Sequence, residues 1–323
     1  MRGPRVLIDD IASIENLSDA FCQCLKGKRK AVGANKVFLD WDLRLLELQR
    51  NLRKGENFPW GNYREFYVTD PKRRKIAAAS FFDRVAHRAI HNILSPILDS
   101  LLLPNIFACR IGKGNGRAVV FLRQLMVEHP DCRVVKMDVR KYFASINQYT
   151  LRKKLDRVLP DESCRSLIVG LLRSWSSRKG RGLPLGNLTS QLFANFYLND
   201  LDKEMNRLVQ GKYLRYMDDL VFLVREKKDI SSIVRVAVRM GKRDNLDFPI
   251  GKRPVFDPRV GVPFLGFLVK KESVVPFNRN RRRFEKRMAA QIATNVPLYE
   301  IYQGIISNQA WRNFPVGASR LRG

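Results

Sequence analysis

The stretch Tyr213–Val224 constrains the fold most, because two adjacent carboxylates, Asp218 and Asp219, interrupt an otherwise mostly apolar and aromatic run. β-Branched and aromatic residues on both sides predict two short strands, with the acidic pair at a tight turn between them. Aspartate is common at turns, so a solvated hairpin tip is one interpretation. The other is a metal site, since like charges beside an apolar sheet repel each other and a hard cation such as Mg²⁺ removes that repulsion.

The charge balance points to a polyanionic partner. The chain has 60 Lys and Arg residues against 31 Asp and Glu, a formal net charge of +29. Such an excess favours nucleic acid, with an anionic membrane surface as the rival. The cations are spread among aromatic residues rather than along one amphipathic helix, and the sequence has no run of 18 or more apolar residues. A membrane partner is therefore the weaker hypothesis.

Length and cysteine usage bound the class of protein. The chain of 323 residues is long enough for two or three domains with a sizeable core. The first ten residues lack the apolar centre of a signal peptide, and the five cysteines have no framework spacing. We therefore expect a cytoplasmic protein.

Hydrophobic periodicity predicts a mixture of helices and strands. Residues 1–32 give no clear element. Helices are predicted over residues 34–53, 80–103 with a kink at Pro96, 148–158, 162–175, 191–209 and 230–242. A further helix is predicted to follow residues 107–117 and to end at about residue 129. Strands are predicted over residues 63–69, 133–146, 263–269 and 273–277. Helical patterning resumes from residue 278 to about residue 314.

Two further stretches carry positive charge and are candidates for binding phosphate or another ligand. Four cations lie within Lys72–Ile76, which is either a solvated face or a phosphate clamp. The segment Phe107–Arg117 is rich in glycine, which permits close backbone approach to a ligand, and Arg110 and Lys113 add charge there. This segment lacks the Gly-Lys-Ser/Thr of a Walker loop.

A third carboxylate completes a possible catalytic set. The strand that begins at Arg133 reaches Asp138, and we expect it to neighbour the acidic hairpin in one sheet. Three carboxylates on neighbouring strands could hold two divalent ions. Two such ions, about 3.5–4 Å apart, stabilise both the attacking and the leaving oxygen of a phosphoryl displacement. In a basic chain this arrangement suggests nucleotidyl transfer.

The order of these motifs resembles that of reverse transcriptases over residues 60–315. One motif alone would be weak, whereas the ordered set is specific. The main motifs are Asp138-x-x-x-Tyr-Phe143, Gly182-Leu-Pro-Leu-Gly-x-x-x-Ser-Gln191, Tyr216-Met-Asp-Asp219 and Phe264-Leu-Gly266. The upstream blocks are Pro71-Lys-x-Arg74, Asp83-Arg-Val85 and Ala108-Cys-Arg-x-Gly-Lys-Gly114.

The second main motif separates lineages. Group II intron and retron enzymes usually have Gln-Gly-x-x-x-Ser-Pro, whereas here Leu185 replaces the Gln and Gln191 replaces the Pro. This form resembles the reverse transcriptases of diversity-generating retroelements. The resemblance implies copying of a template RNA into cDNA from a DNA primer and dNTPs, with frequent errors opposite template adenines, and transfer of the cDNA into a variable target gene. It also implies a small, basic, oligomeric accessory protein as partner.

Two alternatives remain open. One is a retron-like or defence-associated reverse transcriptase of ordinary fidelity. The other is a non-catalytic RNA-binding protein on a polymerase scaffold. The intact set Asp138, Asp218 and Asp219 argues against the second, because a binder gains nothing from carboxylates clustered in a basic groove.

The resemblance implies an α+β fold of the right-hand polymerase type. The fingers with an N-terminal extension would span residues 1–132, partly interleaved with the palm. The palm, with an antiparallel sheet that holds the carboxylates, would span residues 133–277. A helical thumb would span residues 278–323.

The resemblance also implies roles at the reaction centre. Asp138 and Asp218 would be the main ligands of two Mg²⁺ ions, with Mn²⁺ a possible substitute. Asp219 would lie close by, and the Val139 carbonyl could add a ligand. Phe143 would be the steric gate that faces the sugar 2′ position and so favours dNTPs, with Tyr142 as the rival.

Further residues would contact the nucleotide. Lys72 and Arg74 would hold the triphosphate, Arg110 would assist them or grip template phosphates, and Gln191 would line the nucleotide pocket. Leu185 lies where faithful relatives have a polar Gln near the nascent base pair. An apolar side chain there loses hydrogen-bond selection, a physical route to low fidelity. The alternative is that Leu185 only packs.

The remaining roles concern the primer and template. Tyr216 and Met217 would contact the primer end, and Lys113 would contact template phosphates. The primer grip would be formed by Phe264, Leu265 and Gly266. Arg281 and Arg282 would follow the template–primer backbone, a contact that salt should weaken steeply. Lys252 would lie near the leaving pyrophosphate.

Overall fold

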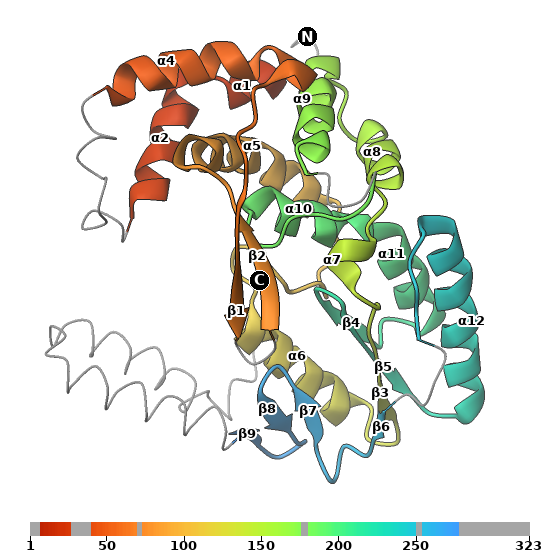
Figure 1. Cartoon of the computed structure of the whole chain (residues 1–323). Coiled ribbons are helices and arrows are strands. Elements are labelled where there is room, and N and C mark those ends of the chain that lie inside the picture. Colours follow the sequence, from red (N-terminus) through yellow and green to blue (C-terminus); the bar gives the residue numbers. More distant parts are fainter. Residues whose placement is uncertain (1–6, 27–39, 70–72, 176–179, 250–253, 278–323) are drawn as a thin grey trace, which may run out of the picture. The chain divides into compact units, whose positions relative to one another are not determined.

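The computed structural model describes residues 7–26, 40–69, 73–175, 180–249 and 254–277 (Figure 1). The helices are α1 Leu7–Ile11, α2 Ile14–Leu25, α4 Trp41–Leu52, the 3-10 helix η1 Gly55–Asn57, α5 Phe81–Ser100, α6 Asn115–Glu128, α7 Tyr142–Ser145, α8 Gln148–Asp156, α9 Glu162–Arg173, α10 Leu188–Tyr197, α11 Asn199–Leu208 and α12 Lys227–Asp244. The strands are β1 Arg64–Thr69, β2 Arg73–Ala78, β3 Arg133–Met137, β4 Tyr213–Tyr216, β5 Asp219–Val224, β6 Val255–Phe256, β7 Val262–Phe264, β8 Phe267–Val269 and β9 Val274–Pro276.

The chain divides by packing into two compact units, each assembled from three stretches. Unit 1 comprises Met1–Leu103, Val139–Glu204 and Val236–Pro249. Unit 2 comprises Pro104–Asp138, Met205–Arg235 and Ile250–Gly323. The predicted boundaries of fingers, palm and thumb stay a prediction, and the thumb lies outside the described residues.

Unit 1 is mainly helical. Its longest helix, α5, packs against α2 and α10 and begins at Ser80, whose hydroxyl accepts a hydrogen bond from the Asp83 N–H at 3.2 Å. Its only described sheet is the antiparallel hairpin β1–β2. The N-terminal helices α1 and α2 were not predicted, since they are short and depend on packing against α5 rather than on their own periodicity.

Unit 2 contains a four-stranded antiparallel sheet in the order β4-β5-β3-β6 and a three-stranded sheet in the order β7-β8-β9. Helix α6 shares one core with strands of both sheets (Figure 1). Buried members of that core include Leu122, Val134, Leu214, Val221, Phe264 and Phe267. The predicted mixed α+β class with antiparallel sheets is confirmed.

Three predicted elements were wrong in extent. The strand predicted over residues 133–146 ends at Met137, and α7 follows it. The helix predicted over residues 191–209 is two helices, α10 and α11, separated at Leu198 without a glycine or proline to signal the break. The strand predicted over residues 263–269 is the hairpin β7–β8.

No helix in the described part of the chain is long and apolar enough to cross a membrane.

Candidate active site

The acidic pair lies at the turn of the predicted hairpin in unit 2. Strands β4 and β5 are antiparallel, and their last pair is Tyr216 with Asp219. Met217 and Asp218 form the two-residue turn, with a positive φ of 54° at Met217. Two-residue hairpins favour turns with positive φ at the first central position, because these match the twist of the strands. Asp218 and Asp219 are both half-buried.

The third carboxylate emerges beside this turn. Strand β3 pairs with β5, and its last residue, Met137, lies opposite Leu220. Extending this antiparallel register by one position places Asp138, which follows β3, opposite Asp219, the first residue of β5. Asp138 is exposed. The expectation that the strand leading to Asp138 neighbours the acidic hairpin in one sheet is confirmed, while the part of the three carboxylates in catalysis stays a prediction.

The donor set fits a hard cation in its chemistry. Mg²⁺ prefers oxygen ligands and keeps sites for water and phosphate. Within the described residues, no three His, Cys, Asp or Glu side chains are gathered closely enough to hold a metal ion. For the three carboxylates to share an ion, their oxygens would have to lie closer together than they do here.

A buried arginine supports the acidic turn, and sequence reasoning did not single it out. Arg215 is 0% exposed, and its Nη1 donates to the Met217 carbonyl at 2.9 Å. Its backbone N–H donates to the Asn105 carbonyl at 3.1 Å, and its carbonyl accepts from the Phe107 N–H at 3.0 Å. The available signal was a cation in an otherwise apolar strand, because a charged side chain is rarely fully buried without partners.

Two charged residues of the glycine-rich segment, Arg110 and Lys113, bind backbone carbonyls just before it. Arg110 Nη1 donates to the Ile106 carbonyl at 2.9 Å, and Lys113 Nζ donates to the Pro104 carbonyl at 2.7 Å. Lys113 Nζ also lies 5.2 Å from the centre of the Phe107 ring. Both side chains therefore brace the segment that precedes α6, and their predicted contacts with nucleotide and template stay predictions.

In unit 1, the segment Leu185–Asn187 extends the β1–β2 hairpin. The Ala77 N–H donates to the Leu185 carbonyl at 2.9 Å, and Asn187 Nδ2 donates to the Ala77 carbonyl at 3.3 Å. Gly186 has a φ of 113°, and a Cβ there would lie 2.9 Å from Ile76 Cγ2. Only glycine fits this contact and this backbone together. Leu185 is thereby fixed beside the strand that carries Arg74.

Three cations of the basic run form exposed parts of β2. Arg73 lies 4.0 Å from the Tyr67 ring centre, and Lys75 forms an ion pair with Glu65 at 2.7 Å. Arg74 pairs with Val68 and, by strand alternation, points to the other face of the hairpin. Lys72 lies outside the described residues.

Helix α7 distinguishes the two candidate gate residues. Tyr142 is 2% exposed, and its hydroxyl donates to the Ala194 carbonyl. Phe143 is only half-buried, with its ring edge-on to Tyr142 at 5.8 Å between centres. Because Tyr142 is enclosed by the fold, Phe143 is the more accessible of the two. The Phe143 carbonyl accepts from the Leu183 N–H at 2.9 Å, which joins α7 to the segment that carries Leu185.

The last residue of the second main motif, Gln191, lies in the first turn of α10 in unit 1. Its N–H donates to the Asn187 carbonyl at 3.3 Å. Four predicted nucleotide contacts, Arg74, Phe143, Leu185 and Gln191, therefore belong to one unit. Val139, the proposed carbonyl ligand, is buried there directly after Asp138 in the chain.

The predicted primer grip is the tip of the β7–β8 hairpin in unit 2. Leu265 and Gly266 form its turn with φ values of 48° and 88°. Positive φ at both central residues is the requirement of a type I′ hairpin turn. Phe264 is buried in the core with α6, and Tyr216 packs against the same core. Lys252, Arg281 and Arg282 lie outside the described residues.

Comparison with known proteins decides the family. The model of the family described as reverse transcriptase (RNA-dependent DNA polymerase) matches residues 69–269, more than half of the chain. The chain belongs to the reverse transcriptase family. The prediction of an enzyme of this class is confirmed, whereas the diversity-generating lineage stays a prediction.

Relatives of this reverse transcriptase are distant. It is 23% identical to Protein YkfC of Escherichia coli (strain K12) over 292 residues, covering 75% of this chain and 76% of that protein. Among solved structures, apo telomerase from Candida tropicalis matches with a TM-score of 0.50 and 10% identity, covering 67% of this chain and 48% of that one.

The same telomerase in complex with a TWJ fragment of telomeric RNA matches with a TM-score of 0.50 and 10% identity. That match covers 78% of this chain and 52% of the telomerase, so the reverse transcriptase spans about half the length of the telomerase chains. At this identity the likeness concerns the fold, and it agrees with the expected polymerase type.

Proposed function

We propose that this reverse transcriptase copies an RNA template into cDNA at a centre formed by Asp138, Asp218 and Asp219, and that it does so inaccurately opposite template adenines. The observation that carries the proposal is the register of β3, β5 and β4, in which Asp138 directly follows β3, Asp218 lies in the β4–β5 turn and Asp219 begins β5. The family match supplies the reaction class.

The carboxylates would serve as ligands for two Mg²⁺ ions, or Mn²⁺ in their place. Divalent ions bound there would stabilise the attacking and leaving oxygens of nucleotidyl transfer. Asp138 and Asp218 are the principal proposed ligands, with Asp219 and the Val139 carbonyl beside them. Arg215 would keep the turn that carries Asp218 in place through its bond to the Met217 carbonyl.

Unit 1 would supply most of the nucleotide contacts, and Arg110 would be the one proposed contact that belongs to unit 2. Lys72 and Arg74 would neutralise the triphosphate, Arg74 from the exposed strand β2. Phe143 would exclude a ribose 2′-hydroxyl, and its partial exposure supports this choice over Tyr142. Arg110 and Gln191 would complete the nucleotide contacts. Most residues proposed to recognise the nucleotide would then lie on segments whose backbones are held by hydrogen bonds.

The low-fidelity proposal rests on Leu185. Its carbonyl is held by the Ala77 N–H, so its half-buried side chain projects from a restrained backbone. A leucine offers no hydrogen bond to a base pair, and a site that cannot form such bonds discriminates poorly between partners of similar shape. The resemblance to diversity-generating retroelements supplies the expected bias toward template adenines.

The template–primer duplex would contact Tyr216, Met217, Lys113, the hairpin tip Leu265–Gly266 with Phe264, and Arg281 and Arg282. Lys252 would lie near the pyrophosphate. Partners would be the template RNA, a DNA primer, dNTPs and a small basic accessory protein. The +29 net charge agrees with a polyanionic partner.

The test is primer extension on a mixed-sequence RNA template with Mg²⁺ and dNTPs, followed by sequencing of the cDNA. Asp218→Asn should abolish synthesis. The matched control is Asp131→Asn, the same chemical change at a side chain that is 74% exposed in unit 2. Synthesis that persists in Asp218→Asn would overturn the metal assignment.

The distribution of errors tests the finer proposal. Errors concentrated opposite template adenines, in cDNA that Asp218→Asn does not make, would support the diversity-generating role. Evenly low errors would leave a reverse transcriptase without that role. If synthesis requires a second component, the candidate accessory protein is added to both the parent enzyme and the variant.

A further inference from the structure

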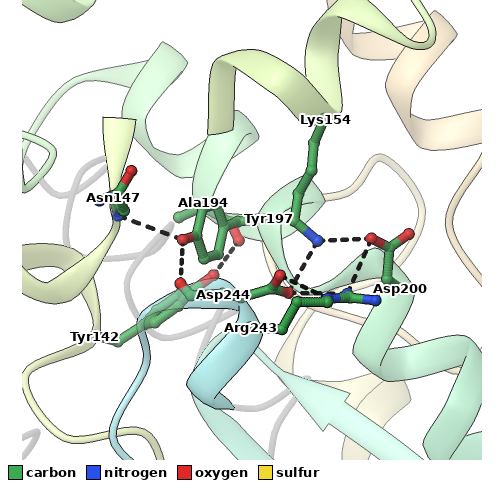
Figure 2. Close-up of polar contacts among 8 residues, drawn as sticks. All are labelled: Tyr142, Asn147, Lys154, Ala194, Tyr197, Asp200, Arg243 and Asp244. Carbon is green, nitrogen blue, oxygen red and sulfur yellow. Dashed lines mark hydrogen bonds and ion pairs between the residues drawn. The ribbon is translucent and has the colours of Figure 1, made fainter. Parts of the chain in front are cut away.

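A cluster of four charged side chains lies in unit 1, and none of the four is assigned to the reaction. Lys154 of α8 places its Nζ 2.7 Å from Asp200 Oδ2 and 3.0 Å from Asp244 Oδ2 (Figure 2). Arg243 Nε lies 2.9 Å from Asp244 Oδ1, and its Nη2 lies 3.2 Å from Asp200 Oδ2. The two cations and two carboxylates balance in charge, and they join α8, α11 and α12.

Two members of this ion cluster are nearly removed from water. The side chain of Lys154 is 7% exposed and that of Asp244 is 5% exposed. Burial alone would raise the pKa of the Asp200 carboxyl, but the Lys154 ammonium group lowers it below its usual value. Such pairs add little net stability, yet removal of one partner leaves a buried charge uncompensated. The cluster therefore fixes a geometry more than it strengthens the fold.

Tyr197 connects the cluster to the start of α8. Its hydroxyl donates to the Asp244 carbonyl and accepts from the Asn147 N–H at 3.4 Å (Figure 2). Asp244 ends α12, so its carbonyl is one of the last four of the helix and has no intrahelical donor. Burial raises the pKa of the Tyr197 hydroxyl to about 12, which keeps it protonated as a donor.

Asn147 is the residue at which α7 passes into α8. Its side chain caps α8 by accepting from the Thr150 N–H at 2.9 Å, while its N–H contacts Tyr197. At the other end of α7, the Arg140 N–H donates to the Asp247 carbonyl, just beyond α12, at 2.9 Å. Both ends of α7 are thus tied to Asp244 and its neighbours.

Helix α7 needs contacts with other segments, and these ties are among them. It has only four residues, fewer than a helix needs to be stable alone, and it starts after Lys141, which has a φ of 47°. Such a φ is unfavourable for lysine and persists only when surrounding contacts impose it. Phe143 lies in the middle of this short helix.

We propose that the ion cluster and the Tyr197 hydroxyl are a positioning device for α7, and that they fix the Phe143 ring where it separates dNTPs from rNTPs. The inference rests on the proposed function, in which Phe143 is the steric gate. Lys154, Tyr197 and Asp244 act through the backbone of residues 140–147 and do not contact substrate.

The experiment measures single-nucleotide extension with a dNTP and with the matching rNTP, and compares the two values of kcat/KM. Tyr197→Phe removes the bridging hydroxyl and keeps the ring, and Lys154→Met removes the buried cation. Each should lower the dNTP preference roughly 10- to 100-fold, as expected for a displacement of about 1 Å at a positioned group. The lower preference should come from a higher kcat/KM for the rNTP, with kcat for the dNTP nearly unchanged.

Matched controls lie on α8, the helix that carries Lys154. Tyr149 is 60% exposed and Lys153 is exposed, so Tyr149→Phe and Lys153→Met repeat both chemical changes outside the cluster. Neither control should alter the preference. All variants are assayed at a temperature at which circular dichroism shows them folded, so loss of stability is separated from loss of selection.

A double-mutant cycle decides whether the effect passes through Phe143. If it does, Tyr197→Phe added to Phe143→Ala should change the preference no further than Phe143→Ala alone. A preference lost in Phe143→Ala but kept in folded Tyr197→Phe and Lys154→Met would overturn this inference alone. A preference unchanged in Phe143→Ala would overturn the gate assignment of the proposed function, and this inference with it.

Discussion

The Arg215 guanidinium donates to the Met217 carbonyl at 2.9 Å from a residue that is 0% exposed. A fully buried cation thus holds the turn that carries Asp218. The arrangement explains how a residue with φ of 54° is kept at the first turn position in a chain that has methionine there rather than glycine.

Arg215→Met should impair both folding and synthesis. Without the guanidinium, the Met217 carbonyl loses this donor, which should cost ~1–3 kcal/mol in the free energy of unfolding. Displacement of the acidic turn should lower kcat for DNA synthesis about 100-fold. Chemical denaturation and primer extension measure the two effects. Arg225→Met, at a side chain that is 70% exposed, is the matched control. Full activity in Arg215→Met would refute the supporting role.

Leu185→Gln should raise fidelity. The amide restores a hydrogen-bonding group at a position whose backbone is already fixed by Ala77, and errors opposite template adenine should fall roughly tenfold. Sequencing of cDNA made by the parent enzyme and the variant measures the rate. Leu188→Gln makes the same change three residues later and should leave the error rate as it was. Equal error rates in Leu185→Gln and the parent would mean that Leu185 only packs.

Gly186→Ala should destabilise unit 1. The new Cβ would lie 2.9 Å from Ile76 Cγ2 at a φ of 113°, so strain and overlap combine. The expected loss in the free energy of unfolding is about 1–3 kcal/mol. Gly112→Ala is the control, because Gly112 also has positive φ (70°) but its Cβ would meet nothing within 4 Å. A loss no greater in Gly186→Ala than in Gly112→Ala would show that the contact with Ile76 is immaterial.

Acid should destabilise the fold through His87. Burial lowers the pKa of His87 to about 4, and its Nδ1 lies 2.7 Å from Thr189 Oγ1. Below the ordinary histidine pKa of about 6.5 the unfolded chain binds a proton that the fold does not, so stability falls as pH decreases. The loss should continue to about pH 4 and total ~3 kcal/mol.

Urea denaturation at several pH values between 7 and 4 checks this dependence. His87→Asn should be less stable near pH 7 but should lose stability less steeply on acidification. His91, whose pKa burial also lowers to about 4, remains in both proteins and contributes equally to each. An identical slope in the parent and in His87→Asn would contradict the assignment.

Much of the candidate site could be predicted because local signals and the fold agree there. The hairpin around Asp218 has β-branched and aromatic flanks, and Asp138 directly follows a short strand that contains two valines. The sequence offered less for α7, since a four-residue helix has no periodicity of its own. Its start at Lys141, with positive φ, is imposed by contacts that involve residues some fifty to a hundred positions away.

The supporting residues were the hardest to foresee. Arg215 and Lys154 resemble surface cations in the sequence, and only the packing of distant segments shows that both are buried. The partners of Lys154 are 46 and 90 residues further along the chain. Pairing over such separations leaves no short-range signal, whereas a single cation inside the apolar run of β4 was a visible anomaly.

The division of each unit into three stretches bears on how the chain is made. A ribosome that has reached Glu204 has produced most of unit 1, including Lys154 and Asp200, but not Val236–Pro249. Lys154 then lacks the second of its two carboxylates, and the Tyr197 hydroxyl lacks the carbonyl of Asp244. Helix α7 consequently receives these restraints only after the acidic hairpin has been synthesised, so the proposed nucleotide contact of Phe143 is completed after the carboxylates exist.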